Sequence, residues 1–298
     1  MKNYLNHIFI DGLAGMAHGL FATLIVGTII QQIGLLAGGS TGDMIYLIGK
    51  MAAAVTGAGI GVGVACRFKE STLVVVSAAI TGMVGAFACK LLAGAVLVEG
   101  AIVLAGPGEP LGAMINWGTE QQPFLMGIVV SVLMGMILTL PISSAALGII
   151  LNLSGIAAGA ATVGCCCNMV GFAVASYREN GVGGLLAQGI GTSMLQMPNI
   201  VRKPVIWLPA ILSSAILGPI STMLLHMTNN ATGSGMGTAG LVGQIMTWQT
   251  MAEAEPTTMV LLKILAIQII LPAIATLLIS EFMRKKGWIA EGDMKLEM

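Results

Sequence analysis

A carboxylate and two amides stand directly before a long apolar segment near the middle of the chain. They are Glu120, Gln121 and Gln122, and Pro141 interrupts the apolar residues that follow. A carboxylate accepts hydrogen bonds from paired hydroxyl groups, and a glutamine side chain both donates and accepts them. Glu120 and Gln121 are therefore candidates for orienting the hydroxyl groups of a solute. The alternative is that this polar cluster only marks the boundary between water and membrane.

Further uncharged hydrogen-bonding side chains lie inside the apolar parts of the chain. They are Gln31, Gln32, Asn168, Gln188, Thr192, Ser193, Gln196, Asn199, Asn229, Asn230 and Gln244. Amide and hydroxyl groups of this kind suit a neutral, hydroxyl-rich solute such as a sugar. A charged substrate would require Arg or Lys within the apolar segments, where the candidates are Lys90 and Lys263. The pattern therefore favours a neutral polar solute.

Two glycine-rich segments, residues 181–199 and 232–244, are predicted to break the helices around them. Such breaks expose backbone N–H and C=O groups that need partners inside a membrane. Substrate hydroxyl groups or water could supply those partners, or nearby polar side chains could satisfy the backbone themselves. The predicted substrate-binding residues are Glu120, Gln121, Gln188, Thr192, Ser193, Gln196, Asn199, His18, Asn168 and Thr238. For His18, between Gly15 and Gly19, the alternative is a packed hydrogen-bonding residue.

The composition indicates an all-α polytopic membrane protein. Hydrophobic residues make up 56% of the 298 residues and charged residues only 9%, and no ionisable Asp, Glu, Lys, Arg or His occurs from Gln121 to Tyr177. A soluble chain of this size carries far more charge, whereas long uncharged apolar stretches are typical of membrane-spanning helices. The net charge of zero gives no electrostatic basis for binding nucleic acid.

No motif of a soluble enzyme or of a metal site occurs in the sequence. The chain lacks a phosphate-binding Gly-x-x-x-x-Gly-Lys-Ser/Thr loop, a His-Glu-x-x-His motif and a Gly-x-Ser-x-Gly motif. Three of its five cysteines are consecutive, Cys165-Cys166-Cys167, a spacing that suits neither a disulfide scaffold nor a tetrahedral zinc site. We therefore predict no catalytic residue, no metal and no cofactor, and interpret the cysteines as small packing residues.

The hydropathy pattern predicts about eight transmembrane helices. The expected spans are 8–36, 44–66, 72–98, 124–151, 153–176, 204–226 and 257–282, with 181–201 as a discontinuous span or a re-entrant hairpin. Residues 99–122 are expected to form a loop or half-helix, and 228–255 a polar loop. Lys and Arg concentrate in short cytoplasmic loops of membrane proteins. Residues 67–69, 202–203 and 284–286 carry such clusters, which predicts that both termini are cytoplasmic.

Weak internal repeats occur along the chain. Gly19-Leu20-Phe21-Ala22 resembles Gly184-Leu185-Leu186-Ala187, and Pro141-Ile142-Ser143 recurs as Pro219-Ile220-Ser221. Many transporters are built from repeats that are inverted in the membrane. We therefore interpret residues 1–298 as one integral membrane domain with repeat halves at about 1–150 and 151–298. Chance matching in a chain rich in Gly, Leu and Ala is the alternative.

Four longer runs carry a resemblance to a known family. They are residues 11–25 (DGLAGMAHGLFATLI), 122–127 (QPFLMG), 138–146 (LTLPISSAA) and 188–199 (QGIGTSMLQMPN). With these runs the chain resembles the EIIC-type membrane component of the bacterial phosphoenolpyruvate phosphotransferase system. The branch it resembles includes proteins described as perfringolysin regulators. Only Gly118-Thr119-Glu120 faintly echoes the Gly-Ile-Thr-Glu sugar motif of glucose-type EIIC proteins.

The resemblance implies a sugar-translocating subunit in the bacterial cytoplasmic (inner) membrane, a multi-pass homodimer. It would work with separate EIIA and EIIB proteins that deliver a phosphoryl group, as at most the permease part of a sugar phosphotransferase. Two alternatives stay open at this point. One is an ion- or proton-coupled carrier that uses Asp11, His18 and Glu120, and the other is a membrane sensor that binds a ligand without moving it.

Overall fold

The computed structural model describes residues 12–20, 22–23, 26–92, 95–98, 101–104, 108–140 and 144–296. Of the residues discussed above, Asp11 and Pro141-Ile142-Ser143 lie outside this range, as does the side chain of Lys90. The chain divides into two compact units, residues 1–109 and 110–298, and each is described by itself. The repeat halves near residue 150 stay a prediction.

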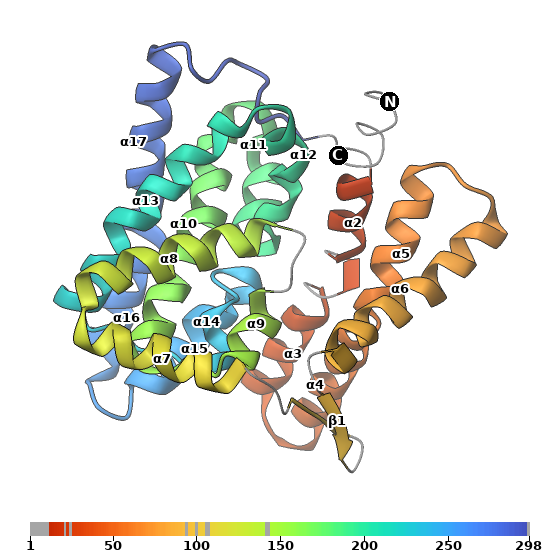
Figure 1. The fold of residues 1–298 in the computed structure, drawn as a ribbon, viewed down its shortest axis with the longest axis horizontal. Helices are drawn as coiled ribbons and strands as arrows, with labels where there is room; N and C mark the ends of the chain where they lie inside the picture. The colour runs from red at the N-terminus through yellow and green to blue at the C-terminus, as the bar shows by residue number, and fades with distance from the viewer. Residues whose placement is uncertain are drawn as a thin grey trace. The chain divides into compact units, whose positions relative to one another are not determined.

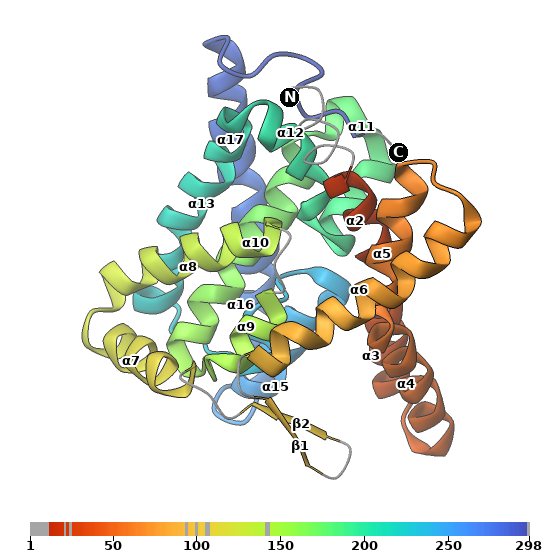
Figure 2. The same ribbon diagram turned by 45° about the vertical axis from the view of Figure 1, so that its right-hand side comes forward.

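The predicted all-α class is confirmed, with one short β-hairpin added (Figure 1). Strands β1 (Ala95–Val98) and β2 (Ala101–Leu104) pair antiparallel, with Ala95 opposite Leu104 (Figure 2). The span expected at 72–98 therefore ends early, because helix α6 (Thr72–Leu92) stops before the hairpin begins. The two β-branched residues of β1, Val96 and Val98, favour this extended conformation.

The described part of unit 1 contains four more helices. They are α2 (Leu13–Leu20), α3 (Val26–Ala37), α4 (Gly39–Ala54) and α5 (Thr56–Arg67). The span expected at 8–36 thus falls on two helices, α2 and α3. The span expected at 44–66 is bent by 49° where α4 meets α5 at Val55.

Alternating glycines of α5 form two separate packing seams. Gly59 and Gly63 face α2, where a Cβ added at Gly63 would lie 2.2 Å from the carbonyl oxygen of Gly15. Gly61 faces α6 instead, where an added Cβ would lie 1.9 Å from the carbonyl oxygen of Ala78. Their spacing by four residues places Gly59 and Gly63 on one face of α5, which lets two membrane helices approach closely. One helix therefore packs backbone against backbone on both sides.

Unit 2 is built from eleven described helices and six short 3-10 or π segments. The helices are α7 (Gly108–Gln121), α8 (Pro123–Thr139), α9 (Ser144–Ile150), α10 (Gly155–Ala175), α11 (Tyr177–Leu186), α12 (Met197–Arg202), α13 (Leu208–Pro219), α14 (Ala231–Ser234), α15 (Val242–Met251), α16 (Thr257–Ile264) and α17 (Leu271–Lys285). The short segments are η3 (Ala187–Gly191), η4 (Ser193–Gln196), η5 (Pro204–Trp207), η6 (Ile220–Leu224), η7 (Ala239–Leu241) and η8 (Leu265–Ile270). Of these, η3, η6 and η8 are π-helical.

Helix α10 forms the centre of unit 2, and α8, α13 and α17 pack around it (Figures 1 and 2). Its sequence is mostly Gly, Ala, Cys and other small residues, and every residue from Ala157 to Met169 is buried. A Cβ added at Gly164 would lie 1.8 Å from the carbonyl oxygen of Ser131 on α8. The three cysteines Cys165, Cys166 and Cys167 are buried and free, as expected for packing residues.

Among the described residues, three helices are long and apolar enough to cross a membrane. They are Gly155–Ala175, Pro204–Leu224 and Thr257–Lys285, and the bent pair of α4 and α5 would make a fourth. The span expected at 124–151 divides into α8 and α9. The number of eight crossings and the orientation of the termini stay predictions.

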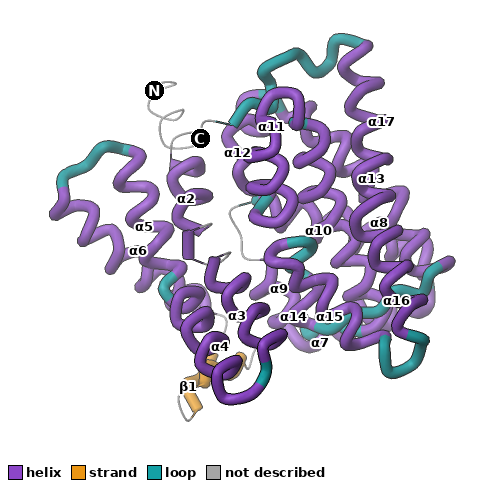
Figure 3. Tube along the Cα trace, turned by 180° about the vertical axis from the view of Figure 1, so that it is seen from behind, coloured by secondary structure: helices purple, strands orange, loops and turns teal. Residues whose placement is uncertain are grey.

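The segment 228–255 is not the polar loop that the sequence predicts. It folds into the interior as α14, η7 and α15, joined by short turns that Figure 3 draws in teal. Ser234, Thr238 and Thr247 are all buried there. The reason is that each of these hydroxyl groups finds a partner inside the unit, so that polarity does not place the segment in water. Residues 99–122 are a half-helix, α7, only from residue 108 onward.

Candidate functional site

The predicted interruption at 181–201 is present and carries a chain of buried amides. After α11 the backbone passes through the π-turn η3 and the 3-10 turn η4 before α12 begins. Gln188 Nε2 donates to Ser176 Oγ at 2.8 Å, and Gln196 Nε2 donates to Gln188 Oε1 at 2.9 Å. Asn199 Nδ2 donates to Gln196 Oε1, also at 2.9 Å. These hydrogen bonds all run in one direction, from Asn199 toward Ser176.

Burial makes this amide chain energetically important. Gln188, Gln196 and Ser176 are fully buried, and Asn199 is only 6% exposed. A buried polar group without a partner costs about 1–3 kcal/mol, so each member of the chain depends on the next. Gln196 Nε2 also donates to the backbone oxygen of Met294, and Asn199 Nδ2 to that of Lys295, both at 2.9 Å. The second donor of each amide is therefore used by the segment that follows α17.

A second polar cluster joins Ser193 and Asn168 through a residue that sequence reasoning missed. Thr139 Oγ1, at the end of α8, lies 2.8 Å from Ser193 Oγ and 3.2 Å from Asn168 Oδ1. Trp207 Nε1 donates to the same Asn168 oxygen at 2.9 Å, and Asn168 Nδ2 lies 3.4 Å from Ser214 Oγ on α13. Four elements, α8, η4, η5 and α13, thus converge on Asn168 of α10. The available signal for Thr139 was its place two residues before Pro141.

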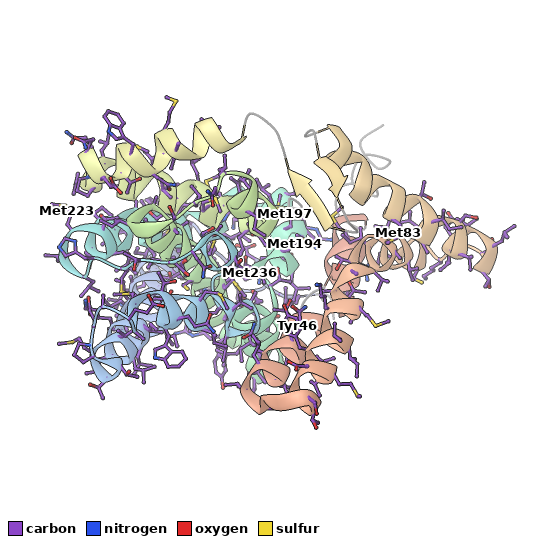
Figure 4. All side chains as sticks on the ribbon, turned by 90° about the horizontal axis from the view of Figure 1, so that it is seen from below. Tyr46, Met83, Met194, Met197, Met223 and Met236 are labelled. Carbon is purple, nitrogen blue, oxygen red and sulfur yellow. The ribbon has the colours of Figure 1, made fainter. Side chains whose placement is uncertain are left out.

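The two glycine-rich segments meet beside this cluster. Thr238 Oγ1 donates to the backbone oxygen of Gly189 in η3. Gly237 has a positive φ of 53°, and a Cβ there would lie 2.8 Å from the Cβ of Cys165 on α10. Buried Met194, Met197 and Met236 belong to these segments and lie within the side chains of unit 2 in Figure 4, whereas Met223 is 46% exposed at its periphery.

Thr192 supports the alternative in which the broken backbone is satisfied locally. Its Oγ1 accepts a hydrogen bond from the backbone N–H of Met194 at 3.2 Å and so caps η4. Its own backbone N–H donates to the carbonyl oxygen of Ala187 at 2.8 Å. Thr192 is therefore engaged in local backbone bonding, whereas Gln188, Gln196 and Asn199 bond to side chains and to a distant segment.

A third hydrogen-bond network contacts α10 at Thr162, and none of its residues was among the predicted site residues. Asn229 Nδ2 lies within hydrogen-bonding distance of Thr162 Oγ1, at 2.7 Å, and of Thr247 Oγ1, at 3.0 Å. Gln268 Nε2, from the π-turn η8, also donates to Thr247 Oγ1 at 3.0 Å. This network fixes segment 228–247 to α10 and η8. Gln268 stands in the middle of an apolar span, and that isolated amide was the signal available in the sequence.

Three predicted site residues lie apart from these buried clusters. Glu120 and Gln121 form the exposed C-terminal end of α7. His18 is exposed on α2, in the other unit. Their roles in binding stay predictions.

Charged groups cluster where the segment after α17 returns to the bundle. Arg284 pairs with Glu179 at 3.2 Å and Lys203 with Asp293 at 2.6 Å. Burial by itself raises the pKa of Asp293, but hydrogen bonds from Lys203 and from the Ala290 N–H, together with the positive charges of Lys203 and Arg284, outweigh it. The pKa of this carboxyl therefore lies below its ordinary value.

The chemistry available inside unit 2 is hydrogen bonding by neutral groups. Its described interior offers amides, hydroxyl groups and an indole N–H, all of which suit hydroxylated solutes. Within the described residues, no group of three or more His, Cys, Asp or Glu side chains could hold a metal ion.

The comparisons with known proteins agree with the architecture. The family model described as phosphotransferase system, EIIC, matches residues 10–116 and 108–296. The two matched segments overlap at 108–116, where unit 1 gives way to unit 2. No curated protein and no solved structure matches the chain. Because the family model covers nearly the whole chain, the protein belongs to the phosphotransferase system EIIC family, the membrane permease subunits of that system.

Proposed function

We propose that this EIIC protein translocates a neutral, hydroxylated solute, a sugar, across the bacterial cytoplasmic membrane. As a member of its family it works with other components of the phosphotransferase system. Separate EIIA and EIIB proteins would supply the phosphoryl group that modifies the sugar during transport. The observation that carries the proposal is the set of uncharged donors and acceptors buried at two interrupted segments, 187–199 and 235–244. Interrupted helices form the binding sites of many transporters.

The proposed binding groups lie around the middle of α10. Asn168, Ser193 and Thr238 project from three different elements, and Trp207 adds an aromatic ring beside them. Each group is now bonded to the protein, so a sugar would have to exchange its hydroxyl groups for these internal bonds. Such an exchange keeps the number of hydrogen bonds constant and costs little in net free energy. Glu120 and Gln121, exposed at the end of α7, would act at an entry position in this scheme, and His18 stays a predicted binding residue of unit 1.

Uptake by reconstituted protein tests the proposal. Proteoliposomes containing the wild-type protein, with EIIA, EIIB and phosphoenolpyruvate-derived phosphoryl donor on the EIIB side, should accumulate phosphorylated sugar. Asn168→Ala and Gln196→Ala should each lower the apparent affinity for the sugar about 10-fold or more, because one or two buried hydrogen bonds are lost. Glu120→Gln tests the predicted entry carboxylate. If Glu120→Gln and Gln196→Ala both leave uptake and affinity unchanged, the binding site lies elsewhere.

The same vesicles separate the other two functions. Binding of sugar without any flux would indicate a sensor. Flux that needs a proton gradient but no EIIB would indicate an ion-coupled carrier. Either result would contradict the proposed coupling to phosphoryl transfer.

A further inference from the structure

We propose that residues 290–296, here called the strap, form an intramolecular latch on the interrupted segment 187–199. The proposal rests on the proposed function, because it assigns a means of regulation to the same site. In Figure 1 the strap leaves α17 and runs back across α11 and α12, and Figure 3 shows the same course from behind.

The strap binds in the manner of an extended peptide. The backbone oxygen of Met294 accepts hydrogen bonds from Asn180 Nδ2 at 2.8 Å and from Gln196 Nε2 at 2.9 Å. The backbone N–H of Leu296 donates to Asn180 Oδ1 at 2.8 Å. The Asn180 side chain therefore both donates to and accepts from the backbone of the strap, as a neighbouring β-strand would. Alternating burial accompanies these bonds, since Met294 and Leu296 are buried and Lys295 is exposed.

Charges fix the register of the strap. Gly292 N–H donates to Glu179 Oε1 at 2.9 Å, and Asp293 pairs with Lys203 at 2.6 Å. Glu179 is held in turn by Arg284, whose guanidinium also donates to the backbone oxygen of Ala175 at 3.1 Å. The strap is thus joined to α11 at 179–180, before the interrupted segment, and to residues 196–203 at its far end.

Two features allow the strap to be released. Gly287 and Gly292 have positive φ angles of 74° and 91° and have open space where a Cβ would stand. Glycine adopts many backbone conformations at such positions, so these two residues can act as hinges. The Lys203–Asp293 pair is also partly open to solvent, with 36% and 21% of the two side chains exposed.

Release of the strap would alter the amide chain directly. Gln196 and Asn199 would each lose one acceptor, the backbone oxygens of Met294 and Lys295. The same two side chains belong to the amide chain, in which Asn199 bonds to Gln196, Gln196 to Gln188, and Gln188 to Ser176. Leaving an amide N–H unbonded inside the protein costs free energy, and a sugar hydroxyl group could serve as the new acceptor. A docked strap therefore holds the segment closed, and a released strap makes its donors available.

Charge reversal in the full-length protein tests the latch. Asp293→Lys and Lys203→Asp each place like charges together, whereas the double variant restores an opposite pair. Glu291→Lys is the matched control, since Glu291 is an exposed carboxylate of the same strap. Hydrogen exchange should rise about 10-fold in the peptide covering 290–296 and also in the peptide covering 187–199 for each single variant, because a repulsive pair replaces an attractive one. Both peptides should return toward wild-type exchange in the double variant and stay unchanged in Glu291→Lys.

The outcomes separate the latch from the transport proposal. Unchanged exchange in 187–199, despite faster exchange in the strap, would overturn the latch whatever the protein transports. Coupled exchange, followed by sugar uptake that rises in both single variants and falls back in the double variant, would support it. Coupled exchange with uptake identical in all variants would overturn the regulatory role. If even the wild-type protein takes up no sugar, the proposed function fails, and the exchange data alone still decide whether the strap controls the segment.

Discussion

A buried side-chain amide has two N–H donors and an acceptor oxygen, and leaving any of them without a partner costs free energy. In unit 2 this cost determines which side chains the buried amides bond to. Gln188, Gln196 and Asn199 solve this by bonding to one another, to Ser176 and to the strap. The arrangement is directional, so the loss of one member leaves groups unpaired on both sides. Hydrogen-bond chains of this kind are specific but vulnerable.

Replacing Gln196 is expected to destabilise the folded protein more than replacing an exposed glutamine. Gln196→Ala removes the donor to Gln188 and to Met294 and the acceptor of Asn199. The expected loss is about 1–3 kcal/mol in the free energy of unfolding, read as a lower thermal midpoint in detergent. Gln249→Ala, at an exposed position of α15, is the control and should change the midpoint little. Equal thermal midpoints for the two variants would contradict the burial of the Gln188–Gln196–Asn199 amide chain.

The strap should loosen in acid, with a midpoint set by Asp293. The pKa of this carboxyl lies below its ordinary value because Lys203, the Ala290 N–H and Arg284 stabilise its charge. Its stabilising contribution is therefore complete above about pH 4, the ordinary Asp pKa, and disappears as the pH falls through the lower folded value. Hydrogen exchange of 290–296, corrected for the intrinsic rate, should thus stay constant from neutral pH to about pH 5 and rise below about pH 4. Asp293→Asn should remove most of that rise, and an identical acid transition in this variant would assign the effect to another group.

At the scale of elements, π-turns mark the places where polar side chains enter apolar helices. Each of the three π segments of unit 2 contains a fully buried polar residue, Gln188 in η3, Ser221 in η6 and Gln268 in η8. A π-turn widens the helix by one residue and shifts which side chains face inward, and such turns occur often at functional sites. The interruption of α11 is therefore one of several related breaks in unit 2.

Close helix packing in unit 1 predicts a sharp difference between two glycine substitutions. Gly61→Ala would place a Cβ 1.9 Å from the carbonyl oxygen of Ala78, so α5 and α6 would have to separate. Overpacking of this kind costs about 1–3 kcal/mol or more. Gly183→Ala is the control, because nothing lies within 4 Å of an added Cβ in α11. A reduced thermal midpoint or yield is expected for Gly61→Ala only, and tolerance of both changes would contradict the α5–α6 seam.

Sequence reasoning found the elements whose signal is local and missed those that depend on tertiary partners. An uncharged apolar stretch was sufficient to predict the central span at 153–176, observed as α10. Glycine-rich polar composition predicted the interruption within 181–201, observed at η3 and η4. The polar segment 228–255 was misjudged because two of its polar groups have distant partners. Asn229 bonds to Thr162, 67 residues away, and the backbone oxygen of Gly235 accepts from Ser144, 91 residues away. The role of the strap was invisible for the same reason, since Asn180 and Met294 are far apart in the chain.

The candidate site was predictable in its chemistry but not in its partners. The neutral amides at 188, 196 and 199 do share one network, as their common segment suggested. Thr139, Ser176 and Trp207 were missed, because a single Thr, Ser or Trp beside an apolar span carries no distinctive pattern. Only the fold brings these residues to the middle of α10 or to its end.

At the scale of the whole molecule, membership of the EIIC family predicts dependence on a partner protein. Because the chain carries no nucleotide-binding motif, the energy for accumulation must come from outside it. Omitting EIIB from the reconstituted vesicles should therefore reduce sugar accumulation to the equilibrium level, whereas EIIB restored to the vesicles should recover it. Accumulation above equilibrium without EIIB would contradict the phosphotransferase coupling.

The location of the bound sugar is the most direct test of the account. Hydrogen exchange of the wild-type protein would be compared with and without the sugar that most raises its thermal midpoint in a screen. The account predicts that protection is concentrated in 187–199 and 235–244, the two segments that meet at Thr238 and Gly189. Protection confined to unit 1 or to α7, with both segments unchanged while the sugar is bound, would contradict it.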